Sequence, residues 1–361
     1  ELTVDALYEN VLLLNEHPEA DMIYSDEDKI GEDGVCYSPF FKPDWSPDLF
    51  LSQMYTCHFG VYRASLIRKI GGFRVGYEGS QDYDLVLRFT EQTNHIFHIP
   101  KILYHWRTIA ESTALNSSSK GYAYVAGLKA LQSALERRGE SGWVEAVENY
   151  PGQYRAHFSV QGQPLVSVLI PTRDMAQVLA PCLQSLFAVT AYKRFEVVLI
   201  DNGSKREDTK QLLQYWRDKE PERFRVLELD IPFNYSRLNN EAAKAARGEY
   251  LVLLNNDIRI VSPDWLEEML GQAQRASVGA VGARLLYPNR TIQHVGVTLG
   301  IVGPANHGHR GVEAASPGYF GRLLVTANYA AVTGACLLVS KKRYEAVGGL
   351  DESLSIDFND V

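Results

Sequence analysis

The chain has 361 residues, of which 45% are hydrophobic and 22% are charged, which is ordinary for globular protein and long enough for two domains. Its formal net charge is -8, and no run of Lys and Arg is interleaved with aromatic residues, so a nucleic-acid-binding surface is excluded. No apolar stretch reaches the ~20 residues that span a bilayer, and the four cysteines are far apart without a C-x-x-C pair, which argues against a disulfide framework or a zinc site and favours a reducing compartment.

The first part of the chain contains two strand-like segments with helical patterns before and after them. An acidic stretch, residues 25–28, follows the first of these strands directly. A polar connector with scattered glycines follows the last helix, and we place a domain boundary near residue 160. The predicted elements are a helix whose apolar face is Val4, Leu7, Val11 and Leu12, strands at 20–24 and 96–103, and a helix at 122–138.

The second part of the chain alternates regularly between strands and helices. This order predicts a mostly parallel sheet with flanking helices, in which a ligand binds at the carboxyl ends of the strands. The residues just after each strand are therefore the candidates for a site. The predicted strands are 165–170, 195–200, 225–229 and 250–254, and the predicted helices are 176–187, 209–216 and 239–246.

Several motifs of the first part recur in the second part in the same order, which predicts an internal repeat with a long period. The chain then holds the back part of one domain and most of another. Because it starts with Glu1 inside a helical pattern and stops at Val361 just after an acidic motif, we expect it to be cut at both ends. The matched pairs are 25–28 with 255–257, 70–73 with 347–350, and 81–82 with 359–360.

Acidic side chains follow the first two strands of the second part. Asp174 and Asp201 could bind a nucleobase and its ribose, or they could simply cap the helices that follow, and their spacing does not decide between the two. A dinucleotide-binding fold would place G-x-G-x-x-G after the first strand, because only glycine lets the backbone approach a pyrophosphate closely. Residues 171–174 read Pro-Thr-Arg-Asp, which argues against an oxidoreductase.

The triplet at 255–257, with 26–28 as its counterpart, places carboxylates at a sheet edge, where a hard divalent cation and substrate phosphates could meet. Such a triplet alone is often only a solvated turn, and its recurrence in the repeat favours the metal.

Asp82 opens an apolar-periodic helix and could act as a general base or as a plain first-turn acid. His105 and Arg107 could contact a metal or a diphosphate, although a lone histidine is more often structural. His294, His307 and His309 lack metal-ligand spacing and favour a loop role.

Taken together, these motifs resemble those of family-two glycosyltransferases. The resemblance rests on Ser167–Asp174, Val198–Ser204, Leu253–Asp257 and Phe358–Val361 in the second part, and on Tyr24–Ile30, Gly71–Phe73, Gln81–Leu85 and His105–Arg107 in the first. It implies the GT-A fold, a Rossmann-like α/β architecture with a mostly parallel sheet and flanking helices, in two partial copies. The copies would be residues 1–160, the C-terminal part of one domain with a helical connector, and 161–361, the N-terminal and central part of the next.

The resemblance also implies roles for individual residues. Asp360 and Asp82 would be catalytic bases, and Asp257, Asp26, Asp28 and His105 would bind Mn2+ or Mg2+. Asn239 stands where the family often has arginine, and Arg237 is a substitute for it. The metal triplet of the second copy has one carboxylate, and Gln81 and Asn359 replace the glutamate of many members. The nucleotide-sugar donor would contact Pro171, Thr172, Asp174, Asp201, Gly203, Ser204, Arg237, Asn240 and Asn256.

The function implied is inverting, metal-dependent transfer of a hexose or rhamnose to O-antigen, capsule or another surface polysaccharide, with a glycan or lipid-linked glycan as acceptor and no nucleic-acid partner. It places the protein in the cytoplasm and leaves open a peripheral position at the inner face of the plasma membrane. The longer segment of the second copy, residues 282–329, would shape the acceptor or sugar pocket. The alternative is a non-catalytic carbohydrate-binding or scaffolding module of the same fold. A nucleotidyltransferase would need a Gly-rich loop at 171–174, which is missing.

Overall fold

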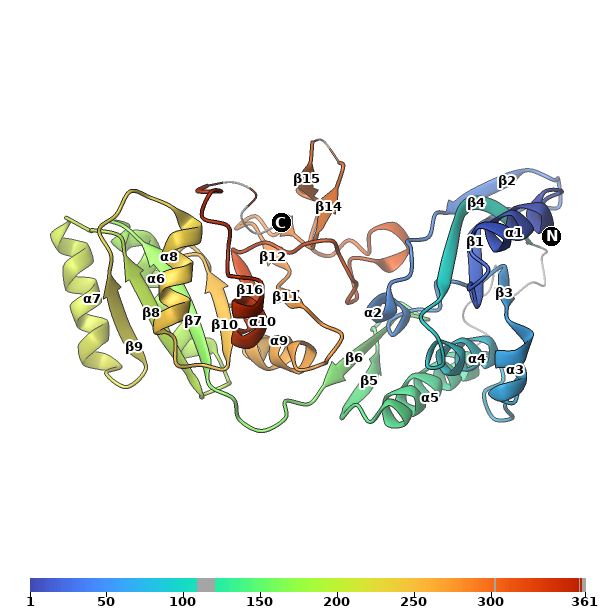
Figure 1. Ribbon diagram of the computed structural model, residues 1–361, viewed down its shortest axis with the longest axis horizontal. Helices are drawn as coiled ribbons and strands as arrows, with labels where there is room; N and C mark the ends of the chain where they lie inside the picture. Colours follow the sequence, from blue (N-terminus) through green and yellow to red (C-terminus); the bar gives the residue numbers. More distant parts are fainter. Residues whose placement is uncertain (109–120, 302, 357, 359–361) are drawn as a thin grey trace. The chain divides into compact units, whose positions relative to one another are not determined.

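The computed structural model of the protein describes residues 1–108, 121–301, 303–356 and 358 (Figure 1). The chain divides into two compact units, which we describe separately. Unit 1 comprises Glu1–His157 and Pro317–Asn328, and unit 2 comprises Phe158–Ser316 and Tyr329–Val361. The first change of unit comes close to residue 160, whereas nothing in the sequence indicated that a segment of the second part belongs to unit 1.

Unit 2 is built on a six-stranded sheet, as far as the structure describes it, with the strand order β11-β16-β10-β7-β8-β9. Strands β10, β7, β8 and β9 are parallel, and β16 and β11 extend the sheet in antiparallel orientation beyond β10. The mostly parallel sheet expected from the alternation is confirmed. The strands are β7 (Val166–Thr172), β8 (Phe195–Asp201), β9 (Phe224–Glu228), β10 (Tyr250–Leu254), β11 (Ala280–Gly282) and β16 (Cys336–Ser340).

Helices cover both faces of this sheet because successive side chains of a strand point to opposite faces. In β7, Val168 and Ile170 pack in the cluster that contains α6, α7 and α9, whereas Leu169 packs in the cluster that contains α8 and α10. All three side chains are fully buried. The helices are α6 (Ala176–Val189), α7 (Glu207–Lys219), α8 (Tyr235–Ala245), α9 (Trp265–Ala273) and α10 (Lys341–Ala346).

Helix α8 begins four residues before the predicted start. The Asn234 side chain accepts a hydrogen bond from the backbone N–H of Arg237 at 2.8 Å, which satisfies one of the free donors at the helix start. Behind the helix, a Cβ on Gly248 would lie 2.6 Å from the backbone nitrogen of Ser167. The Asn234 cap therefore fixes where α8 begins, and Gly248 allows the chain to pass close to β7 before it enters β10.

Between α9 and β16 the chain forms short antiparallel pairs in place of further helices. Strands β12 and β13 form one hairpin, and β14 and β15 form another, with the register Val297↔His307 and Leu299↔Ala305. These elements lie within the long segment that distinguishes the second part of the chain from the first. They are β12 (Leu285–Leu286), β13 (Ile292–His294), β14 (Val297–Leu299), β15 (Ala305–His307) and the 3-10 turn η2 (Tyr319–Gly321).

Unit 1 has a smaller sheet of four strands in the part that the structure describes, with β1 at its centre. Strand β4 pairs with β1 in parallel along its whole length, and β2 and β3 pair with β1 in antiparallel orientation on the other edge. The sequence predicted that the first strand ends before Ser25, which is wrong, because pairing with β4 carries the strand through the acidic motif. The strands are β1 (Met22–Ile30), β2 (Cys36–Phe40), β3 (Gly60–Tyr62) and β4 (Ile96–Arg107), with a separate pair β5 (Gly142–Ala146) and β6 (Tyr154–Phe158).

Helix α1 does not bury the apolar face expected of it. Ala6 and Asn10 are its buried residues, whereas Leu7 and Val11 are 67% and 55% exposed, and Val4 lies before the helix begins. The predicted helix thus exists, but the side chains expected to be buried lie on its exposed face within unit 1. The helices of this unit are α1 (Ala6–Glu16), α2 (Pro47–Phe50), α3 (Ala64–Lys69), α4 (Gln81–Thr90) and α5 (Gly121–Arg138).

The segment Pro317–Asn328 completes unit 1 through aromatic and amide contacts. Phe320 stacks on Phe40 with ring centroids 4.0 Å apart. The side-chain oxygen of Asn328 accepts the backbone N–H of Asp48 at 2.9 Å, and the side-chain NH2 of Asn328 donates to the Asp48 carboxylate at 2.7 Å. These bonds satisfy the first turn of α2, so the segment is an integral part of the unit.

The two units share a short sequence of local elements. In unit 1, β3 pairs antiparallel with β1, which carries the acidic triplet, and the six-residue helix α3 follows β3. In unit 2, β16 pairs antiparallel with β10, which precedes the triplet, and the six-residue helix α10 follows β16. The following glycines, Gly71–Gly72 and Gly348–Gly349, all have φ between 67° and 84°, a region that glycine adopts readily.

None of the helices in the described ranges is both long and apolar enough to cross a membrane.

Candidate functional site

A cavity of about 710 Å³ opens at the carboxyl ends of β7, β8 and β10 in unit 2. This is the edge of a parallel α/β sheet where ligands bind. The start of α8, the β14–β15 hairpin and residues 333–335 complete its walls. Its lining residues are Pro171, Thr172, Arg173, Asn202, Phe233, Tyr235, Leu238, Asn255, Asn256, Val297, Ala305, Asn306, His307, Thr333, Gly334, Ala335, Ile356 and Phe358.

Asn202 is the most deeply buried polar residue of the cavity wall, and the sequence analysis did not single it out. Its amide donates to the carbonyl oxygens of Leu229 and Ile231, at 2.9 and 2.8 Å, which fixes the orientation of the side chain. The side-chain oxygen has no hydrogen-bond partner in the described part of the chain, although the residue is only 1% exposed. A buried acceptor without a partner is unusual and suits a ligand that brings its own donor.

Three of the predicted donor contacts, Pro171, Thr172 and Asn256, lie in this wall. The Asn256 amide donates to the Thr172 hydroxyl at 3.0 Å and so ties the end of β10 to the end of β7. Asn256 is therefore held by the protein, while the side chain of Asp257 next to it is exposed. Of the triplet at 255–257, only Asp257 offers a carboxylate to a cation.

Asp174 and Asp201 both bind backbone N–H groups of the loop that leads into α7. The Asp174 carboxylate accepts the N–H groups of Lys205 and Arg206, at 2.6 and 2.7 Å, and Asp201 accepts that of Ser204 at 2.9 Å. The bond from Arg206, together with that from Lys205, lowers the pKa of Asp174 below its ordinary value. Neither carboxylate caps a helix, because α6 and α7 have no side-chain cap bond and the N–H groups bound here precede the first residue of α7. Both side chains instead fix the loop before α7.

A second hollow, of about 600 Å³, lies beside the first at the end of β8. Asp201, Gly203 and Ser204 line it, and its charged lining is mixed: the cations Lys205, Lys210 and Arg217 stand with the carboxylates of Asp201, Glu207, Glu228 and Asp230. Gly203 has a φ of 75°, and a Cβ there would come within 2.3 Å of the Asp230 carboxylate. The predicted donor residues therefore divide between two neighbouring hollows.

Arg237 and Asn240 lie on α8 outside the residues that line either hollow. Arg237 is exposed. The Asn240 amide donates to the Leu350 carbonyl at 2.9 Å, and its oxygen accepts the hydroxyl of Tyr344 at 2.6 Å and the backbone N–H of Leu350 at 2.9 Å. These bonds hold the loop after α10, so the contacts of Asn240 are internal to the fold.

Two histidines of the hairpin region form a pair at the cavity. The Nδ1 atoms of His294 and His307 are 2.8 Å apart; His294 is 1% exposed, and His307 lines the cavity. His309, by contrast, is exposed and has a φ of 58° in the turn that follows. The loop role expected for all three histidines applies only to His309.

The predicted base Asp360, with Asn359, lies outside the described residues. Its counterpart Asp82 stands in the first turn of α4 and is exposed. The neighbouring Asp84 is fully buried and pairs with Arg74 and Arg88. Asp82 is thus the carboxylate of this helix start that a substrate could reach.

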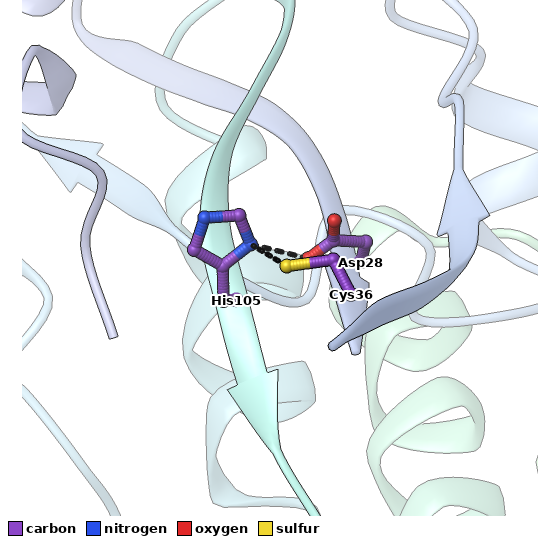
Figure 2. A group of neighbouring side chains, drawn as sticks. All are labelled: Asp28, Cys36 and His105. Atoms are coloured by element: carbon purple, nitrogen blue, oxygen red, sulfur yellow. Dashed lines mark hydrogen bonds and ion pairs between the residues drawn. The ribbon is translucent and has the colours of Figure 1, made fainter. Parts of the chain in front are cut away.

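In unit 1, Asp28 and His105 meet across the parallel pair β1–β4. They are register partners, and Asp28 Oδ1 lies 2.5 Å from His105 Nδ1 (Figure 2). Cys36, the first residue of β2, brings its sulfur to 3.7 Å from the same nitrogen. Partial desolvation, followed by the charge of Asp28, raises the pKa of the Cys36 thiol.

Asp26 does not join this group. Its carboxylate accepts the backbone N–H of Lys42 at 2.8 Å and lies 2.9 Å from Nε2 of His98, whose Nδ1 is 3.2 Å from Asp44. The side chain of Asp26 is 2% exposed as part of this network. Arg107, the other residue singled out beside His105, pairs with Glu1 at 2.6 Å. The four predicted metal ligands therefore fall into three places: Asp257, Asp26, and the Asp28–His105 pair.

Comparison with known protein families gives a match between residues 167–342 and the family described as glycosyl transferase family 2. The chain is 45% identical over its whole length to the uncharacterized protein y4gI of Sinorhizobium fredii, covering 40% of that protein. It is 42% identical over its whole length to the O-antigen biosynthesis protein RfbC of Myxococcus xanthus, covering 28% of that protein. The chain thus spans less than half the length of these relatives.

Among solved structures, the chain is similar to the mannosyltransferase PcManGT from Pyrobaculum calidifontis in complex with GDP-Man and Mn2+. The identity is 19% and the TM-score 0.41, with 55% of this chain and 51% of that chain covered. It is also similar to GalNAc-T7 with UDP, GalNAc and Mn2+, at 17% identity and a TM-score of 0.44, with 54% and 38% covered.

Proposed function

Residues 167–342 belong to glycosyl transferase family 2 with its GT-A fold, and from this premise we propose that the chain is part of an inverting enzyme that moves a sugar from a nucleotide donor to a growing surface polysaccharide. The observation that carries the proposal is the cavity at the carboxyl ends of β7, β8 and β10. Its volume of about 710 Å³ lies in the range of small-molecule sites. The similarity to an O-antigen biosynthesis protein supports a polysaccharide product.

The nucleotide of the donor would occupy this cavity, with the neighbouring hollow at Asp201, Gly203 and Ser204 taking part of it. The unpartnered oxygen of Asn202 suits an N–H of the base, which would satisfy a buried acceptor. Arg173 carries the only formal charge among the described lining residues at neutral pH and suits a phosphate oxygen. Asp174 supports this site by fixing the loop before α7. Asn240 holds the loop after α10, and the exposed Arg237 could reach the donor only from outside the lining of the two hollows.

Asp257 is the residue of unit 2 that would hold Mn2+ or Mg2+, because its carboxylate is exposed just after β10. With one carboxylate in the triplet, donor phosphates must supply other oxygen ligands. The cation, when bound, supplies positive charge that stabilises the departing nucleoside diphosphate. Asn256 contributes by tying β10 to β7 through Thr172.

The base in unit 2 is Asp360, with Asp82 as its counterpart in unit 1. As the acceptor oxygen attacks, its proton passes to the carboxylate. A bond forms between that oxygen and the anomeric carbon, on the face opposite the bond to the phosphate oxygen. That second bond breaks, its electron pair leaves with the nucleoside diphosphate, and the configuration inverts.

We further propose that the chain carries two partial copies of the transferase domain, residues 1–160 and 161–361. The acceptor is a glycan or a lipid-linked glycan, and the β14–β15 hairpin of the long second-copy segment shapes the pocket for the sugar or acceptor. A rhamnosyl or another hexosyl donor fits the family resemblance. We place the reaction in the cytoplasm, with the parent protein at the inner face of the plasma membrane.

The test is calorimetric titration of UDP, GDP and dTDP into the chain, with and without Mn2+. We expect one nucleotide to bind in a Mn2+-dependent manner and Asp257→Ala to abolish the metal dependence. Asp218→Ala, which removes an exposed carboxylate on α7 outside the cavity wall, is the matched control and should bind like the unchanged chain. If both variants lose nucleotide binding, or if the unchanged chain binds no nucleotide, the result would count against the donor site.

A non-catalytic carbohydrate-binding module is the second candidate. The observation in its favour is that the triplet at 255–257 offers a single carboxylate, with the Asn256 amide engaged by Thr172. This candidate predicts glycan binding that is independent of metal and unchanged in Asp257→Ala. Metal-dependent nucleotide binding would exclude it as the sole function.

A further inference from the structure

Unit 1 contains a group of donor atoms whose chemistry differs from that of a magnesium or manganese site. Asp28, Cys36 and His105 come from three strands, β1, β2 and β4, and their side chains point toward one another (Figure 2). One ligand atom from each lies within 4.8 Å of the others. We propose that these three residues bind a transition metal that prefers nitrogen and sulfur ligands, of which Zn2+ is the representative.

The distances between the donor atoms suit such an ion. Zinc bonds of about 2.3 Å to sulfur and about 2.0 Å to nitrogen place the two ligand atoms about 3.5 Å apart in a tetrahedral site. Cys36 Sγ and His105 Nδ1 are 3.7 Å apart. The pair Asp28 Oδ1 and His105 Nδ1, at 2.5 Å, is hydrogen-bonded and must open by less than about 1 Å to share an ion.

The nature of the donors decides which ion is favoured. A thiolate and an imidazole select zinc and similar ions, whereas magnesium and manganese favour carboxylate, carbonyl and water oxygens. The second carboxylate that a hard ion would use is missing from the group, because Asp26 is bound by the Lys42 N–H and by His98. The set of Asp28, Cys36 and His105 therefore fits Mn2+ or Mg2+ poorly.

The environment allows ligand entry. Cys36 is exposed, and the His105 side chain is 25% exposed, so an ion could reach the three donor atoms from solvent. The site shares no residue with the cavity of unit 2, and the proposal does not depend on the transferase proposal.

The experiment is titration of the reduced, metal-free full chain with Co2+, which reports thiolate ligation through an intense near-ultraviolet charge-transfer band, followed by displacement with Zn2+ and Mn2+. We expect the unchanged chain to show the band. Zn2+ should remove it, whereas Mn2+ at the same concentration should not. Cys36→Ser should lack the band. Affinity should fall by more than about tenfold in Asp28→Asn, since even the loss of an outer-shell partner costs about 10–100-fold.

Two variants serve as controls. Cys57→Ser removes a thiol outside the group, and Asp257→Ala removes the candidate cation ligand of unit 2; both should keep the band. Thermal unfolding of Cys36→Ser checks that the variant is folded, which its exposed position favours. The proposal is overturned if Co2+ does not bind, if the band survives in Cys36→Ser, or if Mn2+ displaces Co2+ as well as Zn2+ does.

Discussion

His294 and His307 are joined through their Nδ1 atoms at 2.8 Å, while the backbone N–H of Thr333 donates to Nε2 of His294 at 3.3 Å. Because Nε2 of His294 accepts, the proton of its neutral ring must be on Nδ1, from which it is donated to His307. His307 then carries its own proton on Nε2. The buried histidine thus makes the cavity histidine a hydrogen-bond donor.

This arrangement predicts the tautomers of both rings. In 15N-labelled chain near pH 8, long-range proton–nitrogen correlation spectra should show His294 as the Nδ1–H form and His307 as the Nε2–H form. His294→Asn, whose amide can still donate to His307, should preserve the His307 tautomer, whereas His294→Phe should give a mixture. His309→Phe, a change at an exposed turn, is the control. Two rings protonated at Nε2 would contradict the assigned hydrogen bonds.

A buried ion pair predicts non-additive stability in unit 1. Lys42 Nζ lies 2.9 Å from the Glu27 carboxylate, with side-chain exposures of 0% and 8%. Removing one partner of a buried pair costs about 3–5 kcal/mol, because the other charge is left uncompensated. Lys42→Met should therefore lower the free energy of unfolding by about that amount, and adding Glu27→Gln should recover part of it.

Denaturant unfolding of the two single variants and the double variant measures this coupling. Lys101→Met, which breaks the exposed pair with Glu9, should change stability little. If the Lys42 and Lys101 variants lost the same free energy of unfolding, burial would not determine the cost of breaking an ion pair.

The lowered pKa of Asp174 predicts a pH-dependent contribution to stability. Its carboxylate accepts the N–H groups of Arg206 and Lys205, so its pKa in the folded chain lies below the value of about 3.8 expected in the unfolded chain. The stabilisation is complete above the unfolded pKa and disappears as the pH falls through the folded one. The difference in melting temperature between the unchanged chain and Asp174→Asn should therefore be constant from pH 7 to 5 and shrink below pH 4.

Asp264→Asn provides the comparison, since Asp264 precedes α9 but makes no side-chain cap bond. A difference for Asp174→Asn that grows on acidification, or one that Asp264→Asn reproduces, would refute a stabilising role for the bonds from Asp174 to the loop before α7.

Gly271 tests close packing inside unit 2. A Cβ at this position of α9 would lie 2.0 Å from the carbonyl oxygen of Phe158. Alanine normally favours a helix interior by about 1 kcal/mol over glycine, but the backbone clash should reverse the sign and destabilise by about 1–3 kcal/mol. Gly279→Ala, with no atom within 4 Å of its Cβ, should be neutral or slightly stabilising in the same unfolding measurement. A stabilised Gly271→Ala variant would contradict the packing.

The elements with strong periodicity were predictable from the sequence, and those set by tertiary pairing were not. The strand predicted at 250–254 is β10 to the residue, because its apolar run is bounded by Gly248 and by the amides that follow. The strand predicted to end at residue 24 runs to Ile30, because β4 pairs with it from far along the chain. Local propensity cannot report that pairing.

The site shows the same division. Residues directly after strands, such as Thr172 and Asn256, were found because strand ends identify a sheet edge. Cys36 and His294 were not, because each gains its partner from another hairpin or strand, and neither has metal-ligand spacing in the sequence. A usable signal for His294 was its place in a short strand-like segment, Ile292–His294, within the extra length of the second copy.

The segment Pro317–Asn328 sets the order in which the protein is finished during synthesis. Asn328 bonds to Asp48 across 280 residues of chain, so the ribosome must make most of unit 2 before unit 1 receives its last part. Until then the first turn of α2 and the ring of Phe40 lack the partners that this segment supplies. The unit that is translated first is therefore completed late, and until then its nascent form exposes the surface that this segment covers.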